Sequence, residues 1–500
     1  MVSRNKTRLT LLALAAFAVL SACEKETSQS PAASVSPVTI RVMTFNIEWG
    51  GANVDFSKVV EAIQVSNADI VGIQEAEGNL QRLATELGWH YNLRNYAVSR
   101  FPLIEPPDAN GKYVLVEIEP GKVVALANVH LPSAPYGPDA VRDGATLDEI
   151  IQLERAVRLP KIEPKLDELG RMAARGMPVF LTGDFNAPAH TDWSEDMVGA
   201  RRFMPFAIEW PVSVAVAAAG FRDSWRTVYT DPKTHPGLTW WAGRPPIPNY
   251  VPGENDAEDR IDFIWYAGPA EVLTSEIVGE KGRTDVSYSV SPWPSDHRGV
   301  VSQFSVTPAE IPALVSTEHR IYELGDDVGI VFSKVAGASI EVLRMDGDRE
   351  ISLFVENPVN DSGQIRIPGD KISAGQFAVR TLDASGVTME KEFWVLDPSL
   401  SPTVDVIGDT FTVGQSIPIN WQDAPGNKND YVAVFHAENP ANNEDALAWT
   451  YIDAAPHGHL ELGKNNAEWG WPLAPGKYVV RLLKDDGYDS LAESAVFQIN

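Results

Sequence analysis

The feature that most constrains the fold is a series of short apolar segments that end on Asn, Asp, Glu or His residues. Residues 38–46, 70–74 and 178–183 are rich in β-branched and apolar side chains and predict buried strands. Residues 56–65 and 80–87 have apolar side chains at helical spacing. Strands mixed with helices in this way predict β-sheets that are covered by helices.

Further elements continue this pattern up to Thr307. Residues 113–118 and 123–131 predict a hairpin, with Gly121 in its turn. Thr146 followed by Glu149 is a capping-box pattern, which predicts a helix start, and a second helical stretch ends near Gly176. Two prolines and two further strands complete the set: Pro160 and Pro164, which we expect to break or kink a helix, and residues 260–266 and 299–306.

After Thr307 the helical periodicity fades and short alternating strands replace it. A weak repeat is visible, because residues 322–328 match 411–417 and residues 374–380 match 475–481. Each copy spans roughly 90–100 residues, the size of an immunoglobulin-like β-sandwich. We therefore predict a domain at 38–307 and two all-β, immunoglobulin-like sandwiches, at 308–398 and 399–500.

The N-terminus predicts export. Basic residues precede an apolar run from Leu9 to Leu20, which is too short and wrongly flanked for a spanning helix. The segment 20–23, Leu-Ser-Ala-Cys, resembles the bacterial lipobox, and Cys23 is the only cysteine in the chain. This resemblance implies a signal peptide at 1–23, a lipid on Cys23 and a flexible tether at 24–37. The alternative is an ordinary signal peptide that is cleaved nearby.

The resemblance also predicts the location. It implies an extracytoplasmic lipoprotein that is attached to a membrane through its N-terminal lipid. Glu24 stands where an Asp often marks retention at the inner membrane, so we expect the outer membrane if the source is Gram-negative.

The formal net charge of −27 argues against a stable complex with nucleic acid, which relies on Lys and Arg to neutralise phosphates. It does not argue against phosphate chemistry at a metal ion, because a bound cation inverts the local charge. With one cysteine, the chain has no internal disulfide.

Six polar clusters are the candidate chemistry of residues 38–307. They contain, in chain order, Asn46 and Glu48; Gln74 and Glu75; Asn128 and His130; Asp184 and Asn186; Arg260 and Asp262; Ser295, Asp296 and His297. Taken singly, each is explained as well by a turn, a surface carboxylate or a structural histidine. All six together, in this order, make such a coincidence improbable.

Together these motifs resemble the endonuclease/exonuclease/phosphatase superfamily, which includes pancreatic-type deoxyribonuclease, bacterial sphingomyelinases and inositol polyphosphate phosphatases. The resemblance implies a four-layer α/β sandwich, in which two packed β-sheets are flanked by helices. It also implies a Mg²⁺ cofactor, with Mn²⁺ or Ca²⁺ as alternatives. Glu75 resembles the main metal ligand, with Asn46 beside it and Asp296 as a further candidate.

The same resemblance implies the catalytic roles. Asp184 corresponds to the residue that orients and deprotonates the attacking water, and Asn186 to one that holds this water or the phosphate. His297 corresponds to the phosphate-contacting histidine, Asp262 to the carboxylate that fixes its tautomer, and His130 to a second active-site histidine. The deoxyribonuclease branch pairs its first histidine with a further glutamate, for which only Glu77 is a candidate here.

Three tryptophans and one arginine are candidates for determining the substrate. Trp240, Trp241 and Trp293 flank the later motifs, where aromatic side chains either line a pocket or pack in the core. Core packing is the simpler interpretation. Arg142 is interpreted more readily as half of a surface ion pair than as a phosphate clamp.

The sequence therefore predicts a metal-dependent phosphoric ester hydrolase that acts on diesters or monoesters. Its substrate would be a nucleotide, an oligonucleotide or a phospholipid headgroup, and nuclease-like scavenging at the cell surface is the leading use. A sphingomyelinase-like or phospholipase-C-like hydrolase is the enzymatic alternative. In an alternative of another class, the site is retired and the tandem sandwiches serve adhesion.

Overall fold

The computed structural model describes residues 36–247, 258–347, 349–438, 443–468 and 470–500. The lipobox, Cys23 and all but the last two residues of the predicted tether lie outside these ranges. Within them, no helix combines the length and the apolar character that a membrane crossing requires.

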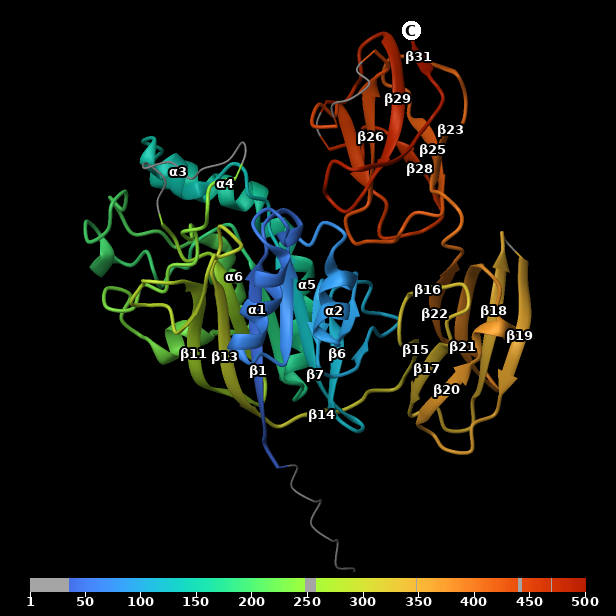
Figure 1. Ribbon diagram of the computed structural model, residues 1–500, viewed down its shortest axis with the longest axis horizontal. Helices are drawn as coiled ribbons and strands as arrows, with labels where there is room; N and C mark the ends of the chain where they lie inside the picture. The colour runs from blue at the N-terminus through green and yellow to red at the C-terminus, as the bar shows by residue number, and fades with distance from the viewer. Residues whose placement is uncertain (1–35, 248–257, 348, 439–442, 469) are drawn as a thin grey trace, which may run out of the picture. The chain divides into compact units, whose positions relative to one another are not determined.

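The first sheet has seven strands in the order β12-β11-β13-β1-β2-β4-β3. Figure 1 labels its neighbouring strands β11, β13 and β1. In its centre, β1 runs parallel to β2 and antiparallel to β13. The strands are β1 (Val38–Asn46), β2 (Ile70–Gln74), β3 (His90–Asn92), β4 (Ala97–Ser99), β11 (Ala270–Glu280), β12 (Tyr288–Val290) and β13 (Gly299–Val306).

The second sheet has the order β5-β6-β7-β8-β10-β9, and β14 pairs with β7. Here β7 and β8 are parallel, whereas β10 is antiparallel to β8. The strands are β5 (Leu103–Ile104), β6 (Val114–Glu119), β7 (Lys122–His130), β8 (Val179–Asp184), β9 (Arg222–Asp223), β10 (Asp262–Ala267) and β14 (Ala309–Glu310).

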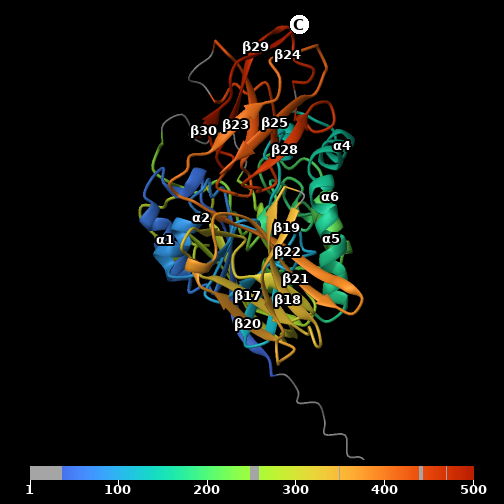
Figure 2. The same cartoon turned by 90° about the vertical axis from the view of Figure 1, so that its right-hand side faces the viewer.

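Helices cover the outer faces of the two sheets. Figure 2 shows α1 and α2 on one side of the sheets and α5 and α6 on the other. The helices are α1 (Phe56–Ser66), α2 (Leu80–Leu87), α3 (Gly137–Arg142), α4 (Leu147–Val157), α5 (Leu159–Ala174), α6 (Pro211–Ala218) and α7 (Ser224–Val228). The predicted four-layer sandwich is confirmed.

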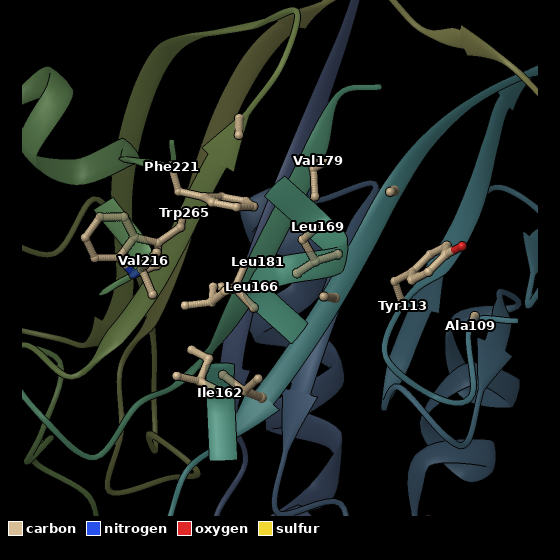
Figure 3. Close-up of a cluster of buried hydrophobic side chains, with 14 of the residues drawn as sticks. Ala109, Tyr113, Ile162, Leu166, Leu169, Val179, Leu181, Val216, Phe221 and Trp265 are labelled. Atoms are coloured by element: carbon tan, nitrogen blue, oxygen red, sulfur yellow. The ribbon is translucent and has the colours of Figure 1, made fainter. Parts of the chain in front are cut away.

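The alternation of side chains along each strand explains the layers. Val42 and Ile70 point into the core between the two sheets, whereas their neighbours Met43 and Val71 pack under α1 and α2. On the opposite side, one face of α5 packs on the second sheet (Figure 3). Because the central strands are buried on both faces, they are apolar along most of their length.

Local sequence signals place two of the predicted elements well. The capping box is present, because Thr146 and Glu149 bond each other's backbone at the start of α4. The helical stretch is interrupted between α4 and α5, just before Pro160, which lies in the first turn of α5, as expected of a helix-breaking proline; Pro164 lies inside α5. A proline is tolerated in the first turn, where the missing N–H has no partner within the helix.

The C-terminal region is all β, as predicted, and each of its two parts contains two sheets (orange and red in Figure 1). The first part has sheets β15-β17-β20 and β16-β22-β21-β18-β19. Its strands are β15 (Leu314–Thr317), β16 (Ile321–Glu323), β17 (Val328–Ser333), β18 (Ser339–Asp346), β19 (Arg349–Glu356), β20 (Gly363–Ile367), β21 (Gly375–Asp383) and β22 (Gly386–Leu396).

The second part has sheets β23-β25-β28 and β24-β31-β29-β26-β27, with β30 beside β29. Its strands are β23 (Thr403–Val406), β24 (Thr410–Phe411), β25 (Ile417–Gln422), β26 (Tyr431–His436), β27 (Ala448–Tyr451), β28 (Gly458–Leu462), β29 (Gly476–Leu483), β30 (Ser490–Glu493) and β31 (Phe497–Ile499).

The sequence repeat reflects equivalent core positions in these two parts. Tyr322 in β16 and Phe411 in β24 are both buried, and each of these short strands pairs in parallel with the last strand of its part. Phe377 in β21 and Tyr478 in β29 occupy the corresponding cores as well. The repeat is therefore a pattern of buried apolar side chains.

Candidate active site

The ends of the central strands bring the polar clusters of residues 38–307 together. Asn46 ends β1 beside Gln74, the last residue of β2, and Glu75 follows directly. In the second sheet, His130 at the end of β7 lies beside Asp184 at the end of β8. Asp262 begins β10 opposite Asp184, because these two strands are antiparallel.

Asn46, Glu75 and Asp184 form the centre of the site. The Nδ2 atom of Asn46 donates to Oε1 of Glu75 at 2.9 Å and to Oδ2 of Asp184 at 3.1 Å. The amide orientation is fixed, because Oδ1 of Asn46 accepts from the backbone N–H of Glu48 at 3.0 Å. Asn46 thus presents its nitrogen to the carboxylates, and metal ligation through its oxygen would require the amide to turn away from Glu48.

The backbone around these residues is held in unusual conformations. Glu48, Trp49, Glu75 and Asn186 all have positive φ, at 54°, 45°, 55° and 47°. The N–H of Trp49 donates to Oε2 of Glu75 at 3.0 Å, which ties this loop to the carboxylate cluster. A positive φ at a non-glycine residue costs roughly 1–3 kcal/mol of conformational free energy, and such residues concentrate at functional sites.

The ring of His297 forms a hydrogen bond with the carboxylate of Asp262. Its Nδ1 is 2.9 Å from Oδ2 of Asp262, and both side chains are buried. With its proton on Nδ1, the ring turns Nε2 toward Asp184, whose Oδ2 is 3.6 Å away. This is the arrangement of a histidine whose tautomer and orientation are fixed by a carboxylate.

His130 approaches the same carboxylates from β7. Its Nε2 is 3.7 Å from Oε1 of Glu75 and 3.6 Å from Oδ2 of Asp184. Although this nitrogen is buried, no described residue is within hydrogen-bonding distance of it. Buried polar atoms of this kind require an explanation, and a bound ion or substrate oxygen is one that fits.

Ser295 and Glu48 hold the loop that contains His297. Ser295 Oγ donates to the carbonyl of Asn46 at 2.7 Å and accepts from the N–H of His297 at 3.0 Å. Glu48 accepts from the N–H of Asp296 at 3.1 Å and binds Arg244 through both carboxylate oxygens, each at 2.6 Å. Asn186, finally, is fixed by the carbonyl of Leu131 at 2.9 Å.

Burial and mutual charge set the protonation of the site. Burial raises the pKa of Asp184 to about 6, and the neighbouring His297 limits this rise. Burial by itself would lower the pKa of His297, but the carboxylates of Asp262, Asp184 and Asp296 raise it well above its usual value. Burial also raises the pKa of Glu48 to about 7, although Arg244 opposes this. At neutral pH, Asp184 is therefore available as a proton acceptor and His297 as a donor.

The donor set suits a hard divalent cation. One oxygen each of Glu75 and Asp184 and one nitrogen of His297 lie within 4.8 Å of one another. Ca²⁺ and Mg²⁺ prefer carboxylate oxygens, so Glu75 is the ligand that fits best, which leaves Asp184 beside it free to accept a proton. Because Nδ1 of His297 is engaged by Asp262 and its pKa is raised, this histidine is better suited to donate a proton than to bind the metal. Asp296, the further candidate for a metal ligand, lies beside this group, with its Oδ1 3.9 Å from Nε2 of His297.

Residues 239–242, for which the sequence predicted no helix or strand, make several hydrogen bonds to residues of the site. The backbone of Thr239 and Trp240 bonds Asp259, and the N–H of Ala242 donates to the carbonyl of Asp296 at 2.6 Å. Oγ1 of Thr239, which is fully buried, accepts from the N–H groups of both Ile261 and Asp262, at 3.1 Å each. Thr239 thereby fixes the start of β10, where Asp262 holds His297.

We expect Thr239→Val to lower kcat about tenfold with little change in KM, because two buried N–H groups lose their acceptor and Asp262 loses its fixed position. The unfolding free energy should fall by about 1–3 kcal/mol. Thr239→Ser keeps the hydroxyl and should restore both quantities. Steady-state kinetics and denaturant unfolding of the two variants check this; equal kcat in Thr239→Val and wild type would rule out the positioning role.

A pocket of about 380 Å³ opens over these residues. It is lined by Glu75, Asp184, Asn186, Asp296, His297 and Glu48, together with Trp49, Ser133, Tyr136, Asp139, Trp240 and Ile261. Tyr136 packs edge-on against Trp240, with ring centroids 5.6 Å apart. Trp293, by contrast, is buried beside Phe45, and Arg142 pairs with Asp139 at 2.8 Å.

The sequence pattern of the Endonuclease/Exonuclease/phosphatase family matches residues 43–297, which include every residue of this centre. The chain belongs to this family. A family member of this fold is a phosphoester hydrolase in the broad sense, and such enzymes generally depend on a divalent metal. The family match does not extend to the C-terminal sandwiches.

Individual relatives cover the same region. An uncharacterized protein of Caenorhabditis elegans is 30% identical over 291 residues, which are 53% of this chain and 91% of the relative. Among solved structures, an AP endonuclease from Archaeoglobus fulgidus is 16% identical with a TM-score of 0.35, over 53% of this chain and 98% of its own. A mannosyl-6-phosphatase from Bacteroides thetaiotaomicron is 17% identical with a TM-score of 0.29, over 53% and 99%.

The structure brings all eight predicted site residues of this domain into one centre, either around Asp184 or around the His297 that faces it. It also adds three residues that the sequence did not identify, Thr239, Arg244 and Tyr136, and gives a role to Glu48, for which the sequence suggested none. Glu48 stood in a motif next to Asn46 and could have been suspected on that ground. Arg244 and Thr239 come from a loop segment, for which the sequence held no signal.

Proposed function

We propose that this protein is a Mg²⁺-dependent phosphodiesterase of the cell surface. The observation on which the proposal rests is the convergence of Glu75, Asp184 and His297, whose potential ligand atoms lie within 4.8 Å of one another at the base of the pocket. A divalent ion bound there would neutralise the charge of the phosphoryl group and polarise its phosphorus.

Side chains of the site supply the proton transfer and the hydrogen bonds to the phosphoryl group. Asp184 accepts a proton from the attacking water, which its buried position and a pKa of about 6 permit. Nε2 of His297 donates to a phosphoryl oxygen, while Asp262 holds the ring in place. His130 Nε2, which has no partner among the described residues, faces the same space and supplies a second donor for an oxygen of the substrate.

A diester is favoured over a monoester because both of its esterified groups need a surface to pack on, and the pocket has aromatic side chains. The aromatic side chains Trp49, Tyr136 and Trp240 provide apolar surface for the groups esterified to the phosphate. A nucleotide diester and a phospholipid headgroup both fit this description.

The cell-surface part of the proposal rests on the sequence alone. The lipobox-like segment ending in Cys23 supports a lipid anchor, and residues 24–37 would serve as the tether. Growth in labelled palmitate tests it: the wild-type protein should incorporate the label and Cys23→Ser should not. Incorporation by Cys23→Ser would contradict the anchor.

The catalytic part is tested by comparing bis(p-nitrophenyl) phosphate with p-nitrophenyl phosphate, in Mg²⁺ and after chelation. We expect Mg²⁺-dependent hydrolysis with the higher kcat/KM for the diester. Activity on the monoester alone would replace the diesterase proposal with a phosphatase. Activity that survives complete chelation would contradict the metal requirement.

A further inference from the structure

One side of the pocket is formed by a loop rather than by the end of a strand. Residues 131–136 connect β7 to α3. Ser133 and Tyr136 of this loop line the pocket, and residues 133–135 are exposed. Exposed loops are more mobile than the elements that they connect. The shape of the pocket on this side therefore depends on what holds the backbone of the loop.

A buried arginine holds this backbone. Nη2 of Arg158 donates to the carbonyl of Ser133 at 3.1 Å and to the carbonyl of Pro135 at 2.8 Å. In the part of the chain that the structure describes, these are the only hydrogen bonds of the backbone of residues 133–135. Arg158 lies between α4 and α5, and its side chain is 0% exposed. One guanidinium thus fixes two carbonyls of the loop from below the surface.

Glu154 holds the arginine in turn. Its Oε1 accepts from Nη1 of Arg158 at 2.6 Å, and neither side chain is exposed. The two residues are four positions apart, which places them on the same face of α4. Burial raises the pKa of Glu154 to about 7, and Arg158 opposes this rise. Each charge depends on the other, because a buried charge without its partner is strongly destabilising.

The end of the loop is packed against the same carboxylate. A Cβ on Gly137, the first residue of α3, would lie 2.6 Å from the buried ring of Trp210 and 2.8 Å from Oε1 of Glu154. Only a residue without a side chain allows this approach. Tyr136 precedes Gly137 directly, and its hydroxyl donates to Asp259 at 3.1 Å. The tip of Tyr136 is therefore held by Asp259, and its backbone is held from both sides by contacts of the buried ion pair.

Resting on the phosphodiesterase function proposed above, we infer that Arg158 and Glu154 are positioning residues for substrate recognition. They hold the loop so that the ring of Tyr136 forms a fixed surface, on which one of the two groups esterified to the phosphate packs. Glu75 and Asp184 are placed by strands β2 and β8 and do not depend on this loop. The ion pair therefore determines KM and the choice of substrate, whereas the chemical step is left nearly unchanged.

Replacing both charges tests this in the full chain. The pair variant, Arg158→Met with Glu154→Met, leaves no lone buried charge but removes the donors to the two carbonyls. Its KM for bis(p-nitrophenyl) phosphate should rise about tenfold, the effect of one lost aromatic contact, while kcat stays within about threefold. The control variant, Arg41→Met with Glu276→Met, removes a 2.8 Å ion pair outside the pocket lining and should keep the wild-type KM. An unchanged KM in the pair variant, or an equal rise in both variants, would overturn the inference.

A second substrate tests whether an esterified group is recognised. Methyl p-nitrophenyl phosphate has the same leaving group as bis(p-nitrophenyl) phosphate, but a methyl group replaces the second ring. In the wild type its KM should be about tenfold higher, and the pair variant should lose this difference. A purely structural role of the ion pair would not change the ratio of the two KM values. A ratio that the pair variant retains in full would contradict the recognition role.

Tyr136→Ala tests whether the ion pair acts through this ring. Alone, the substitution should raise KM for bis(p-nitrophenyl) phosphate about tenfold. Combined with the pair variant it should raise KM no further, because changes that remove the same contact are not additive. A combined rise of about a hundredfold would show two independent effects and would overturn the assignment of the ion pair to Tyr136.

Limited proteolysis tests the hold on the loop without any substrate. Chymotrypsin cleaves after aromatic residues, and mass spectrometry measures the cleavage between Tyr136 and Gly137. The rate at this bond should rise at least about tenfold in the pair variant and stay at the wild-type value in the control variant. Equal rates in the wild type and the pair variant would overturn the inference. If the wild type hydrolyses neither diester, the phosphodiesterase function fails, and the proteolysis result still decides whether the ion pair holds the loop.

Discussion

Asp184→Asn should lower kcat by about 10²–10⁴-fold, because this is the usual contribution of a general base. The substitution preserves the shape of the side chain, and its amide oxygen still accepts the N–H of Asn186, which donates to Oδ1 at 2.8 Å in the wild type. An amide does not take a proton from water. The loss should therefore appear in steady-state turnover of a phosphodiester while the fold remains intact.

Two controls separate this role from a general disruption. Thermal unfolding of Asp184→Asn should remain a single cooperative transition at a somewhat lower temperature, because its amide nitrogen replaces the oxygen that accepts from Nδ2 of Asn46. The wild-type pH profile should also lose activity as the pH falls below about 6, where Asp184 becomes protonated. Turnover within about threefold of the wild type in Asp184→Asn would contradict the general-base role, given the magnitude usual for that role.

His297→Ala should lower kcat by about 10²–10³-fold, the magnitude expected when one preorganised donor to a transition state is removed. The structural reason is that Nε2 of His297 faces the space beside Asp184, while its Nδ1 is committed to Asp262. Because nearby carboxylates raise the pKa of His297 well above its usual value, the ring remains a donor through neutral pH. Activity should decline only as the pH rises through this raised pKa.

Asp262→Asn tests the cause of that raised pKa. The variant keeps the ring of His297 but removes the carboxylate that contributes most to raising its pKa. The alkaline decline in activity should therefore move to lower pH. Its kcat at pH 6 should exceed that of His297→Ala, because a donor is still present. An alkaline limb at the wild-type position would show that His297 is not the group that titrates there.

The elements that were predicted most accurately are those with a regular apolar pattern in their own sequence. Strands β1, β2 and β13 and helix α2 occupy the predicted residues, because their apolar periodicity is set by the same core that they build. The strand β11 was not predicted. The apolar alternation is broken in its first half, where Leu273 and Thr274 are both exposed, and the strand is stabilised by its long pairing with β13, which only the tertiary structure reveals.

The site could be predicted where a residue follows a strand directly, and less well elsewhere. Asn46, His130 and Asp184 end strands whose register places them together, so their convergence follows from the fold. Thr239 and Arg244 lie in a segment without periodicity, and their roles depend on contacts with residues such as Asp262 and Glu48. Of the tryptophans, Trp293 packs in the core, which was the favoured interpretation, whereas Trp240 lines the pocket.

The most direct test is a calorimetric titration of the chelator-treated protein with Mg²⁺, followed by a diesterase assay on the same sample. The wild type should bind the ion and regain hydrolysis of bis(p-nitrophenyl) phosphate in parallel. Glu75→Gln should lose both, whereas Glu61→Gln, at a half-exposed residue that pairs with Lys58 on α1, should lose neither. A folded wild-type protein that neither binds Mg²⁺ nor hydrolyses the diester would contradict the account, and so would a Glu75→Gln variant with wild-type binding and turnover.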